Sequence, residues 1–347
     1  MGPMDTNNEG AVRLAAAADR SRIALILSRL MRHPEFGALV GTLAVFAFFA
    51  VATAGNGFLA WRGVTGWLNV AAELGIVAVP VALLMIGGEL DLSIGSVIGA
   101  TSVLIATASG LYGVPLWISI ALAITLGVGV GLFNGVLTIR TGLPSFIITL
   151  VSMLALAGSA LGMARLLAGT PNVSLKVEGP LRAVFAGRWQ QANVSILWWA
   201  AVSLAAAWVL FRTTFGNWVL ATGGDARSAR EAGIRTDRVK IVLFILTALA
   251  AVLVGIIQTM AFNGGEATRG QVYVFNSIIA SVIGGVLLQG GYGSPIGVAF
   301  GAATFGIVNV GIFYTGWNSD WAQLLLGLLL LAAVLANNLF RRAALSA

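Results

Sequence analysis

Two acidic residues at a spacing of two, Glu89 and Asp91, are the first candidates for chemistry in this chain. They lie in the run GGELDLSIGS, from Gly87 to Ser96, between two long apolar segments. A pair of carboxyl groups can act as general acid and general base, but side chains two positions apart point in different directions on a helix. The pair is therefore a poor catalytic dyad, and an enzyme built on it is the least favoured interpretation.

Other reactive groups are scarce. The chain has no cysteine and one histidine, His33, so a thiolate nucleophile, a disulfide framework and a histidine-based metal cluster are all excluded. Its two lysines, Lys176 and Lys240, do not follow a GxxxxG pattern, which excludes a Walker A phosphate loop. We therefore expect no catalytic residues, no metal, no cofactor and no ATPase site of that type in this chain.

The run that holds the two carboxylates has two structural interpretations. In the favoured one, Gly87 and Gly88 end a helix. Asp91 or Ser93 then accepts hydrogen bonds from the first amides of the next helix. In the other, the loop re-enters a helix bundle, where irregular backbone is tolerated if it is shielded from lipid, and lines or gates a path. Glu89, Asp91 and Ser93 are then pathway or gate candidates.

Four further polar residues lie inside or near long apolar segments: Glu73, Asn134, Gln258 and Asn276. Each can form a hydrogen bond to a neighbouring helix or contact a polar solute, and the first role is favoured for each. Since a solute path through an apolar bundle needs polar groups, Asn134, Gln258 and Asn276 complete the set of pathway or gate candidates.

A polar and basic stretch, TGGDARSAREAGIRTDRVK at 222–240, separates two other apolar segments. The glycines at 223–224 are expected to stop the extension of the preceding apolar helix. Asp225 can then cap a short helix over 226–232, which Gly233 can end. About two turns of helix are marginal in water, so this helix needs a partner surface or the rest of the protein to hold it.

The predicted short helix has two kinds of surface. Ala226 and Ala229 share a face that would permit close approach to a groove, while Arg227, Arg230 and Glu231 would supply ion pairs around it. The alternative is a solvated basic loop without a partner. The docking candidates are Gly224, Asp225, Ala226, Arg227, Ala229, Arg230, Glu231 and Gly233.

Composition identifies the surroundings in which these residues lie. Hydrophobic residues make up 58% of the 347 positions and charged residues 10%, with a mean hydropathy of +0.93. An apolar span needs about 20 residues, so the chain is an all-α polytopic membrane protein with roughly ten spans. The candidate spans are 36–54, 67–86, 94–110, 115–137, 144–164, 194–211, 239–261, 273–289, 296–314 and 321–339.

The basic residues predict an orientation. With both termini in the cytoplasm, more than twice as many basic side chains lie inside as outside, which agrees with the positive-inside rule. The net charge of +7 therefore follows membrane topology and does not indicate nucleic acid.

This orientation divides the chain into three parts: a basic cytoplasmic segment over 1–35 that can lie on membrane lipid, one transmembrane domain over 36–340, and a cytoplasmic tail over 341–347. Within the domain we expect a long external loop over 166–193, suited to an external partner or a short surface helix, and a cytoplasmic loop over 213–238.

Glycines one helical turn apart predict close helix packing. Small residues let backbones approach in lipid, where helices associate by packing. The groups are Gly127 with Gly131 and Gly135, Gly158 with Gly162, and Gly297 with Gly301.

Four motifs in order resemble those of a known family. They are GGELDLSIGS, LPSFIITLVSMLALAG at 143–158, GGDARSAREAGIRTDRVKI, and the segment 275–297 with GGVLLQGGYGSPIG. The combination, from about 65 to 340, resembles permease subunits of bacterial ABC importers for simple sugars, the ribose, xylose and arabinose class, which are related to branched-chain amino acid permeases. One departure is Glu89-Leu90, where many relatives have a single apolar residue.

The resemblance implies a type II-like ABC importer permease fold in the bacterial inner membrane, and several partners. These are a second permease copy or paralogue, a nucleotide-binding subunit that hydrolyses ATP, and a periplasmic sugar-binding protein. The loop matching 223–233 would form the coupling helix that docks on the ATPase. The expected substrate is a pentose, hexose or polyol.

Two other functions are kept as alternatives. The first is an ABC permease for branched-chain amino acids. The second is a secondary transporter that needs no partner, which is disfavoured because proton relays need intramembrane carboxylates and only Glu73 is a mid-span candidate.

Overall fold

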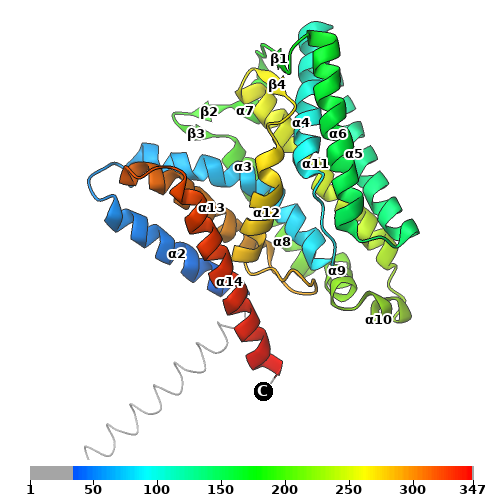
Figure 1. The fold of residues 1–347 in the computed structure, drawn as a ribbon, viewed down its shortest axis with the longest axis vertical. Coiled ribbons are helices and arrows are strands. Elements are labelled where there is room, and N and C mark those ends of the chain that lie inside the picture. The colour runs from blue at the N-terminus through cyan, green and yellow to red at the C-terminus, as the bar shows by residue number, and fades with distance from the viewer. Residues whose placement is uncertain (1–33, 346–347) are drawn as a thin grey trace, which may run out of the picture.

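The computed structural model describes residues 34–345, and the described chain is almost entirely helical (Figure 1). The predicted segment 1–35 therefore lies almost wholly outside the described residues. The elements in chain order are α2 (Pro34–Ala52), α3 (Trp61–Ile86), α4 (Ile94–Ile105) continued by the π-helix η1 (Ala106–Leu111), α5 (Leu116–Thr141), α6 (Ser145–Ala168), β1 (Asn172–Ser174), α7 (Pro180–Ala186), β2 (Arg188–Trp189), β3 (Ala192–Asn193), α8 (Ser195–Arg212), α9 (Thr214–Gly224), α10 (Ala226–Glu231), α11 (Thr236–Ala261), β4 (Gly264–Glu266), α12 (Gln271–Ile283), α13 (Pro295–Thr315) and α14 (Trp321–Leu345).

Eight of these helices are long and apolar enough to cross a membrane, and two shorter apolar stretches lie in α12 and in the first part of α14. The all-α polytopic architecture predicted from composition is thus confirmed. With 13 residues, α12 ends well before the predicted position 289, at two glycines, Gly284 and Gly285. At 1.5 Å per residue it is about 20 Å long, which is shorter than a bilayer core of about 30 Å. In contrast, α14 has 25 residues and continues beyond the predicted position 339 to Leu345.

The core is built around α3 and α11. In its most apolar window, 83% of α3 is buried inside the chain, against 22% for α6 and 17% for α8. The most buried helix, α3, packs against α13, α8, α12 and α11, while α11 also packs against α4 and α5. The outer helices therefore present most of their apolar side chains outward, as helices in contact with lipid do.

Close packing by glycine occurs where α5 meets α11. A Cβ on Gly131 would lie 2.6 Å from the Cα of Ile245, and one on Gly135 would lie 3.0 Å from the Cα of Ile241. The prediction is wrong for Gly158 and Gly162, because α6 leaves open space above both glycines within the described residues.

Short strands tie the loops together at one end of the molecule. Strand β1, after α6, pairs antiparallel with β4, after α11, with Val173 opposite Gly265. The hairpin of β2 and β3 and the short helix α7 fill the remainder of the 166–193 segment. Figure 1 shows α7, β1 and β4 at the end of the molecule opposite α9 and α10.

The segment after α8 differs from the prediction. Instead of one helix stopped by the glycines at 223–224, the chain breaks at Thr213 and begins a new helix, α9. The side chain of Thr213 caps this helix by accepting a hydrogen bond from the Gly216 amide at 3.2 Å. A local cap therefore restarts a helix in the segment that we expected to be part of the loop.

Candidate functional site

The short helix α10 is formed and capped as predicted. Asp225 is its N-cap, and one carboxylate oxygen accepts hydrogen bonds from the amides of Arg227 at 2.8 Å and Ser228 at 3.1 Å. The hydroxyl of Ser228 donates to the other oxygen at 3.0 Å. These bonds lower the pKa of the exposed Asp225 carboxyl below its ordinary value, and the bond from the Ser228 amide has the largest effect. At the other end, Gly233 has a φ of 87°, a left-handed conformation that glycine adopts without strain.

The two faces of α10 differ from the prediction in one respect. Ala229 is only 5% exposed and packs against the rest of the chain, so it is not available to a groove on another protein. The exposed charges form local ion pairs instead, Arg227 with Glu231 and Arg230 with Asp237, each at 3.3 Å. Arg230 also donates to the hydroxyl of Thr236 at 2.7 Å, which holds α10 against the start of α11. The outward surface of α10 is therefore polar and charged.

Three glycine pairs that are far apart in the sequence meet beside α10. They are 87–88 after α3, 223–224 at the end of α9, and 290–291 in the loop between α12 and α13. A Cβ on Gly290 would lie 2.8 Å from the carbonyl oxygen of Gly223 and 3.0 Å from the Cα of Gly88. The amide of Gly291 donates to the carbonyl of Ile86 at 2.8 Å. We call these six residues the glycine junction.

Backbone conformation also requires glycine at this junction. Gly88, Gly290 and Gly291 have φ values of 86°, 84° and 75°, in the left-handed region that residues with a Cβ rarely adopt. The α3–α4 loop and the α12–α13 loop therefore lie next to each other, and both touch the segment that leads into α10.

A buried polar network lies beside the glycine junction. The carboxylate of Asp91 accepts hydrogen bonds from the amide and hydroxyl of Ser93, at 2.9 and 2.6 Å, and from the hydroxyl of Thr247 on α11, at 2.7 Å. Asn134 on α5 donates to Ser93 at 2.9 Å, and Ser152 on α6 donates to Asn134. This Asp91 network joins the α3–α4 loop to α5, α6 and α11.

The Asp91 network supports the interpretation in which polar side chains bond between helices. Asp91, Ser93 and Asn134 are 1%, 0% and 0% exposed, and each has partners. The predicted cap is not formed, because Asp91 accepts from the amide of Ser93, which precedes α4, and the side chain of Ser93 does not cap α4. Nearby, Glu89 forms a largely buried ion pair with Lys240 at the start of α11.

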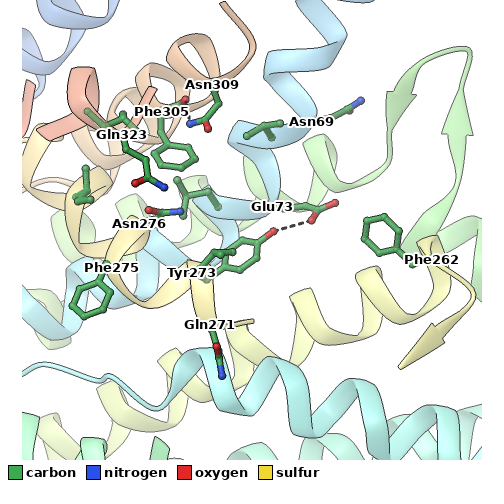
Figure 2. A pocket seen from close by; sticks show the side chains of 15 residues that line it. Asn69, Glu73, Phe262, Gln271, Tyr273, Phe275, Asn276, Phe305, Asn309 and Gln323 are labelled. Carbon is green, nitrogen blue, oxygen red and sulfur yellow. Dashed lines mark hydrogen bonds between the residues drawn. The ribbon is translucent and has the colours of Figure 1, made fainter. Parts of the chain in front are cut away.

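The other two pathway candidates lie elsewhere, around a cavity of about 810 Å³ bounded by α3, α12, α13 and α14. Asn276 lines this cavity together with Glu73 and Tyr273 (Figure 2). Gln258 of α11 lies behind them and donates to Glu73 Oε2 at 2.9 Å and to the Tyr273 hydroxyl at 2.7 Å. The Tyr273 hydroxyl donates to the same carboxylate oxygen at 3.0 Å. The six predicted candidates therefore divide between the closed network with the nearby Glu89 ion pair and the open cavity.

The chemistry available at these places is recognition rather than catalysis. Among the described residues, no group of three or more His, Cys, Asp or Glu side chains could hold a metal ion. The cavity presents one carboxylate, one phenol and several carboxamides, which together can donate and accept hydrogen bonds. Such a surface suits a polar solute.

The family model described as branched-chain amino acid transport system, permease component, matches residues 63–334. The chain belongs to this family. The permease is 32% identical over 304 residues to an inner membrane ABC transporter permease protein of Escherichia coli K12, with 84% of this chain and 89% of the relative covered. It is 30% identical to the ribose import permease protein of the same strain, with coverages of 88% and 94%. It is 26% identical to the xylose transport system permease protein of that strain, with coverages of 98% and 100%. No solved structure matches it significantly.

Family membership agrees with the presence of eight described helices that are long and apolar enough to cross a membrane. The permease is a multi-pass protein of the bacterial inner membrane and a transport subunit of an ABC system, without an ATPase site of its own.

Two residues at the cavity, Tyr273 and Glu73, were not among the pathway candidates chosen from the sequence. Tyr273 was not selected, because a tyrosine at the start of an apolar segment resembles an interfacial anchor. Glu73 was noted as a mid-span carboxylate but was not included among the pathway candidates. A sequence signal for it did exist, since an ionisable side chain near the middle of a long apolar segment is costly unless it has a function.

Proposed function

We propose that the permease is the membrane-spanning subunit of an ATP-driven importer and forms the path for a simple sugar delivered by a periplasmic binding protein. The observation that carries the proposal is its similarity to the ribose import permease, which extends over 88% of this chain and 94% of that protein. A fructose import permease protein of Rhizobium meliloti, 29% identical over 333 residues, supports the same substrate class.

The proposed topology has ten membrane helices with both termini in the cytoplasm. The excess of basic residues around α9, α10 and the chain ends supports this orientation. The 213–238 loop is then cytoplasmic, and the 166–193 segment, with α7, faces the periplasm and the binding protein. The tail at 341–347 and the segment 1–35 would lie at the cytoplasmic surface, next to membrane lipid.

We assign α10 as the coupling helix, held by an ATP-hydrolysing nucleotide-binding subunit. The exposed residues Arg227, Arg230 and Glu231 would contact that subunit, while Gly224 and Gly233 leave room at the two ends of the helix. Asp225 would keep the helix formed. Ala226 and Ala229 would act from the inner side, where Ala229 packs α10 against its own chain.

The glycine junction offers a route from α10 into the membrane domain. Since Gly223 touches the carbonyl of Ile86 and the amide of Gly291, a movement of α9 and α10 would displace both neighbouring loops. Those loops begin α4 and α13. We therefore place the gate at this end, where the Asp91 network and the Glu89 to Lys240 ion pair close the bundle.

The similarity to ABC importer permeases also implies a second permease subunit. The partner is a second copy or a paralogue.

The test is reconstitution of the permease in proteoliposomes with its candidate ATPase and binding protein. Labelled D-ribose, D-xylose and D-fructose are supplied separately, and uptake and ATP hydrolysis are measured together. We expect uptake of at least one sugar that requires ATP and the loaded binding protein. Hydrolysis that is indifferent to the loaded binding protein would contradict the proposal.

Two outcomes would favour the alternatives. Uptake of leucine, isoleucine or valine in place of sugars would assign the substrate class named in the family description. Uptake by the permease alone, driven by a proton or sodium gradient without ATP, would indicate a secondary transporter in which Glu73 carries the coupling ion.

A further inference from the structure

The cavity between α3, α12, α13 and α14 contains a carboxylate without a cationic partner. Glu73 lies near the middle of α3, and none of the ion pairs among the described residues includes it. An ionisable group in a membrane domain is costly and is retained where it has a role. Glu73 therefore calls for a function beyond packing.

The surroundings of Glu73 orient it. Gln258, which is 3% exposed, and the hydroxyl of Tyr273 both donate to Oε2. Gln258 also donates to the oxygen of Tyr273, so the three side chains hold one another in a closed triangle. The second carboxylate oxygen, Oε1, has no partner among the described residues. One oxygen is thus used for positioning, and the other remains available as an acceptor.

Carboxamides without partners share the same cavity. Asn276 of α12 and Gln323 of α14 line it, and their side chains form no hydrogen bond within the described part of the chain. Figure 2 shows these two side chains close to each other on the wall beside Tyr273. In contrast, Asn69 is occupied on both sides, because it donates to the Gln191 carbonyl and accepts from the Asn193 amide.

These groups match the chemistry of a solute with several hydroxyls. A hydroxyl both donates and accepts, so adjacent hydroxyls can donate to a carboxylate while they accept from amide groups. Aromatic and apolar walls, here Phe305 and Leu74, suit the C–H faces of the same solute.

We propose that this cavity is a binding site for a neutral polyhydroxylated ligand, in which Glu73 accepts hydrogen bonds from ligand hydroxyls and Asn276 supplies an amide. Gln258 and Tyr273 act as positioning residues for Glu73. The inference rests on the proposed function, which names a simple sugar as the substrate.

The absence of cysteine from the chain makes a direct test possible. A single cysteine is introduced as Gln271→Cys, at an exposed residue that lines the cavity, in the full-length permease in lipid nanodiscs, and its reaction with a charged methanethiosulfonate reagent is timed. D-ribose, D-xylose and D-fructose are the probes, and glycine betaine, which has no hydroxyl, is the solute control. A bound ligand slows modification by the factor 1 + [L]/Kd, so we expect about fivefold protection at about four times Kd.

A matched cysteine reports non-specific effects. Asn217→Cys also replaces an exposed carboxamide residue, on α9 and outside the cavity lining. Its modification should be unaffected by any sugar.

The role of Glu73 is tested in the Gln271→Cys background. Glu73→Gln keeps the size of the side chain but removes the charged acceptor, so the sugar concentration for equal protection should rise by about tenfold or more. Tyr273→Phe removes one positioning hydrogen bond and should produce a smaller rise. Glu178→Gln, an exposed carboxylate on the loop before α7, should produce none.

Two failures can be told apart. If the importer carries a sugar but that sugar does not protect Gln271→Cys, or protects it equally with Glu73→Gln, this inference is wrong and the proposed function stands. If sugars protect the cavity but no ATP-driven sugar uptake occurs, the proposed function is wrong and the cavity remains a polyhydroxyl site.

Discussion

The carboxylates of Asp91 and Asp225 both accept a hydrogen bond from an amide two residues later, yet only Asp91 is buried. The buried carboxylate joins loop and helices, whereas the exposed one keeps a short helix in shape. The same local motif therefore stabilises tertiary structure in one place and secondary structure in the other.

At Asp225, substitution should loosen α10 without unfolding the membrane domain. Asp225→Ala removes the acceptor for the Arg227 and Ser228 amides, so hydrogen exchange at those amides should speed up, while exchange in α11 stays unchanged. Asp225→Ser, another good N-cap residue, should retain most of the protection. Equal exchange rates at these amides in Asp225→Ala and in the native chain would show that the Asp225 cap does not stabilise α10.

Acid should act on the same cap. Because the pKa of Asp225 is lowered in the folded protein, its contribution is complete above the unfolded value of about 3.9 and is lost as the pH falls through the folded-state pKa. Protection factors of the two amides, corrected for intrinsic exchange, should fall in that acid range in the native chain. They should be flat in Asp225→Ser.

At Asp91, the expected effect is on the whole domain. Asp91→Asn cannot accept all three hydrogen bonds in the same geometry, so it should destabilise the fold by about 1–3 kcal/mol, seen as a lower unfolding temperature in detergent. The control is Asp237→Asn, which alters an exposed ion pair and should change stability by less than about 0.5 kcal/mol. Equal effects of the two substitutions would contradict the network.

Among the elements, the short helices and their breaks distinguish this structure from a simple bundle of ten spans. The short helix α12 ends at a glycine, and the loop after it reaches Gly223 and Gly88. The junction is possible because glycine allows both left-handed backbone and close approach. Three loops thereby contact one another within a region that side chains would keep apart.

Two adjacent glycines provide a sharp test of the junction. A Cβ on Gly223 would overlap the carbonyl of Ile86 and lie 2.7 Å from the Gly291 amide, whereas one on Gly224 would meet nothing within 4 Å. Gly223→Ala should therefore lower the unfolding temperature and abolish uptake, and Gly224→Ala should leave the unfolding temperature unchanged. Similar stability of the two variants would show that the contacts at Gly223 do not support the fold.

For the whole molecule, apolar surface is distributed as a membrane environment requires. The outer helices α5, α6 and α8 expose large apolar side chains such as Leu154, Leu197 and Trp208, while α3 and α11 fill the interior. The charged helix α10 lies at one end of the molecule and α7 at the other (Figure 1).

The two ends should be labelled from opposite sides of the membrane. A single cysteine placed as Ser228→Cys on exposed α10 should react with an impermeant maleimide only in inside-out vesicles. Val184 lies on α7 and is 47% exposed, so Val184→Cys should react only in right-side-out vesicles. Labelling of both from the same side would overturn the proposed topology.

The class of protein, most of its helices and the cap at Asp225 were predictable, because each depends on residues close together in the sequence. An apolar run of about 20 residues indicates a span wherever it occurs. A capped helix ended by glycine, as at 225–233, is encoded within a few positions. The four ordered motifs indicated the family for the same reason.

The tertiary structure alone decided which polar residues meet. Glu73 bonds to Gln258 and Tyr273 across 185 and 200 residues, and Asp91 bonds to Thr247 across 156. Such pairings follow from which helix faces are complementary in the folded bundle, and hydrophobic periodicity does not encode them. This is why six polar candidates chosen together from the sequence separate, in the fold, into the closed Asp91 network with the nearby Glu89 ion pair and the open cavity around Glu73.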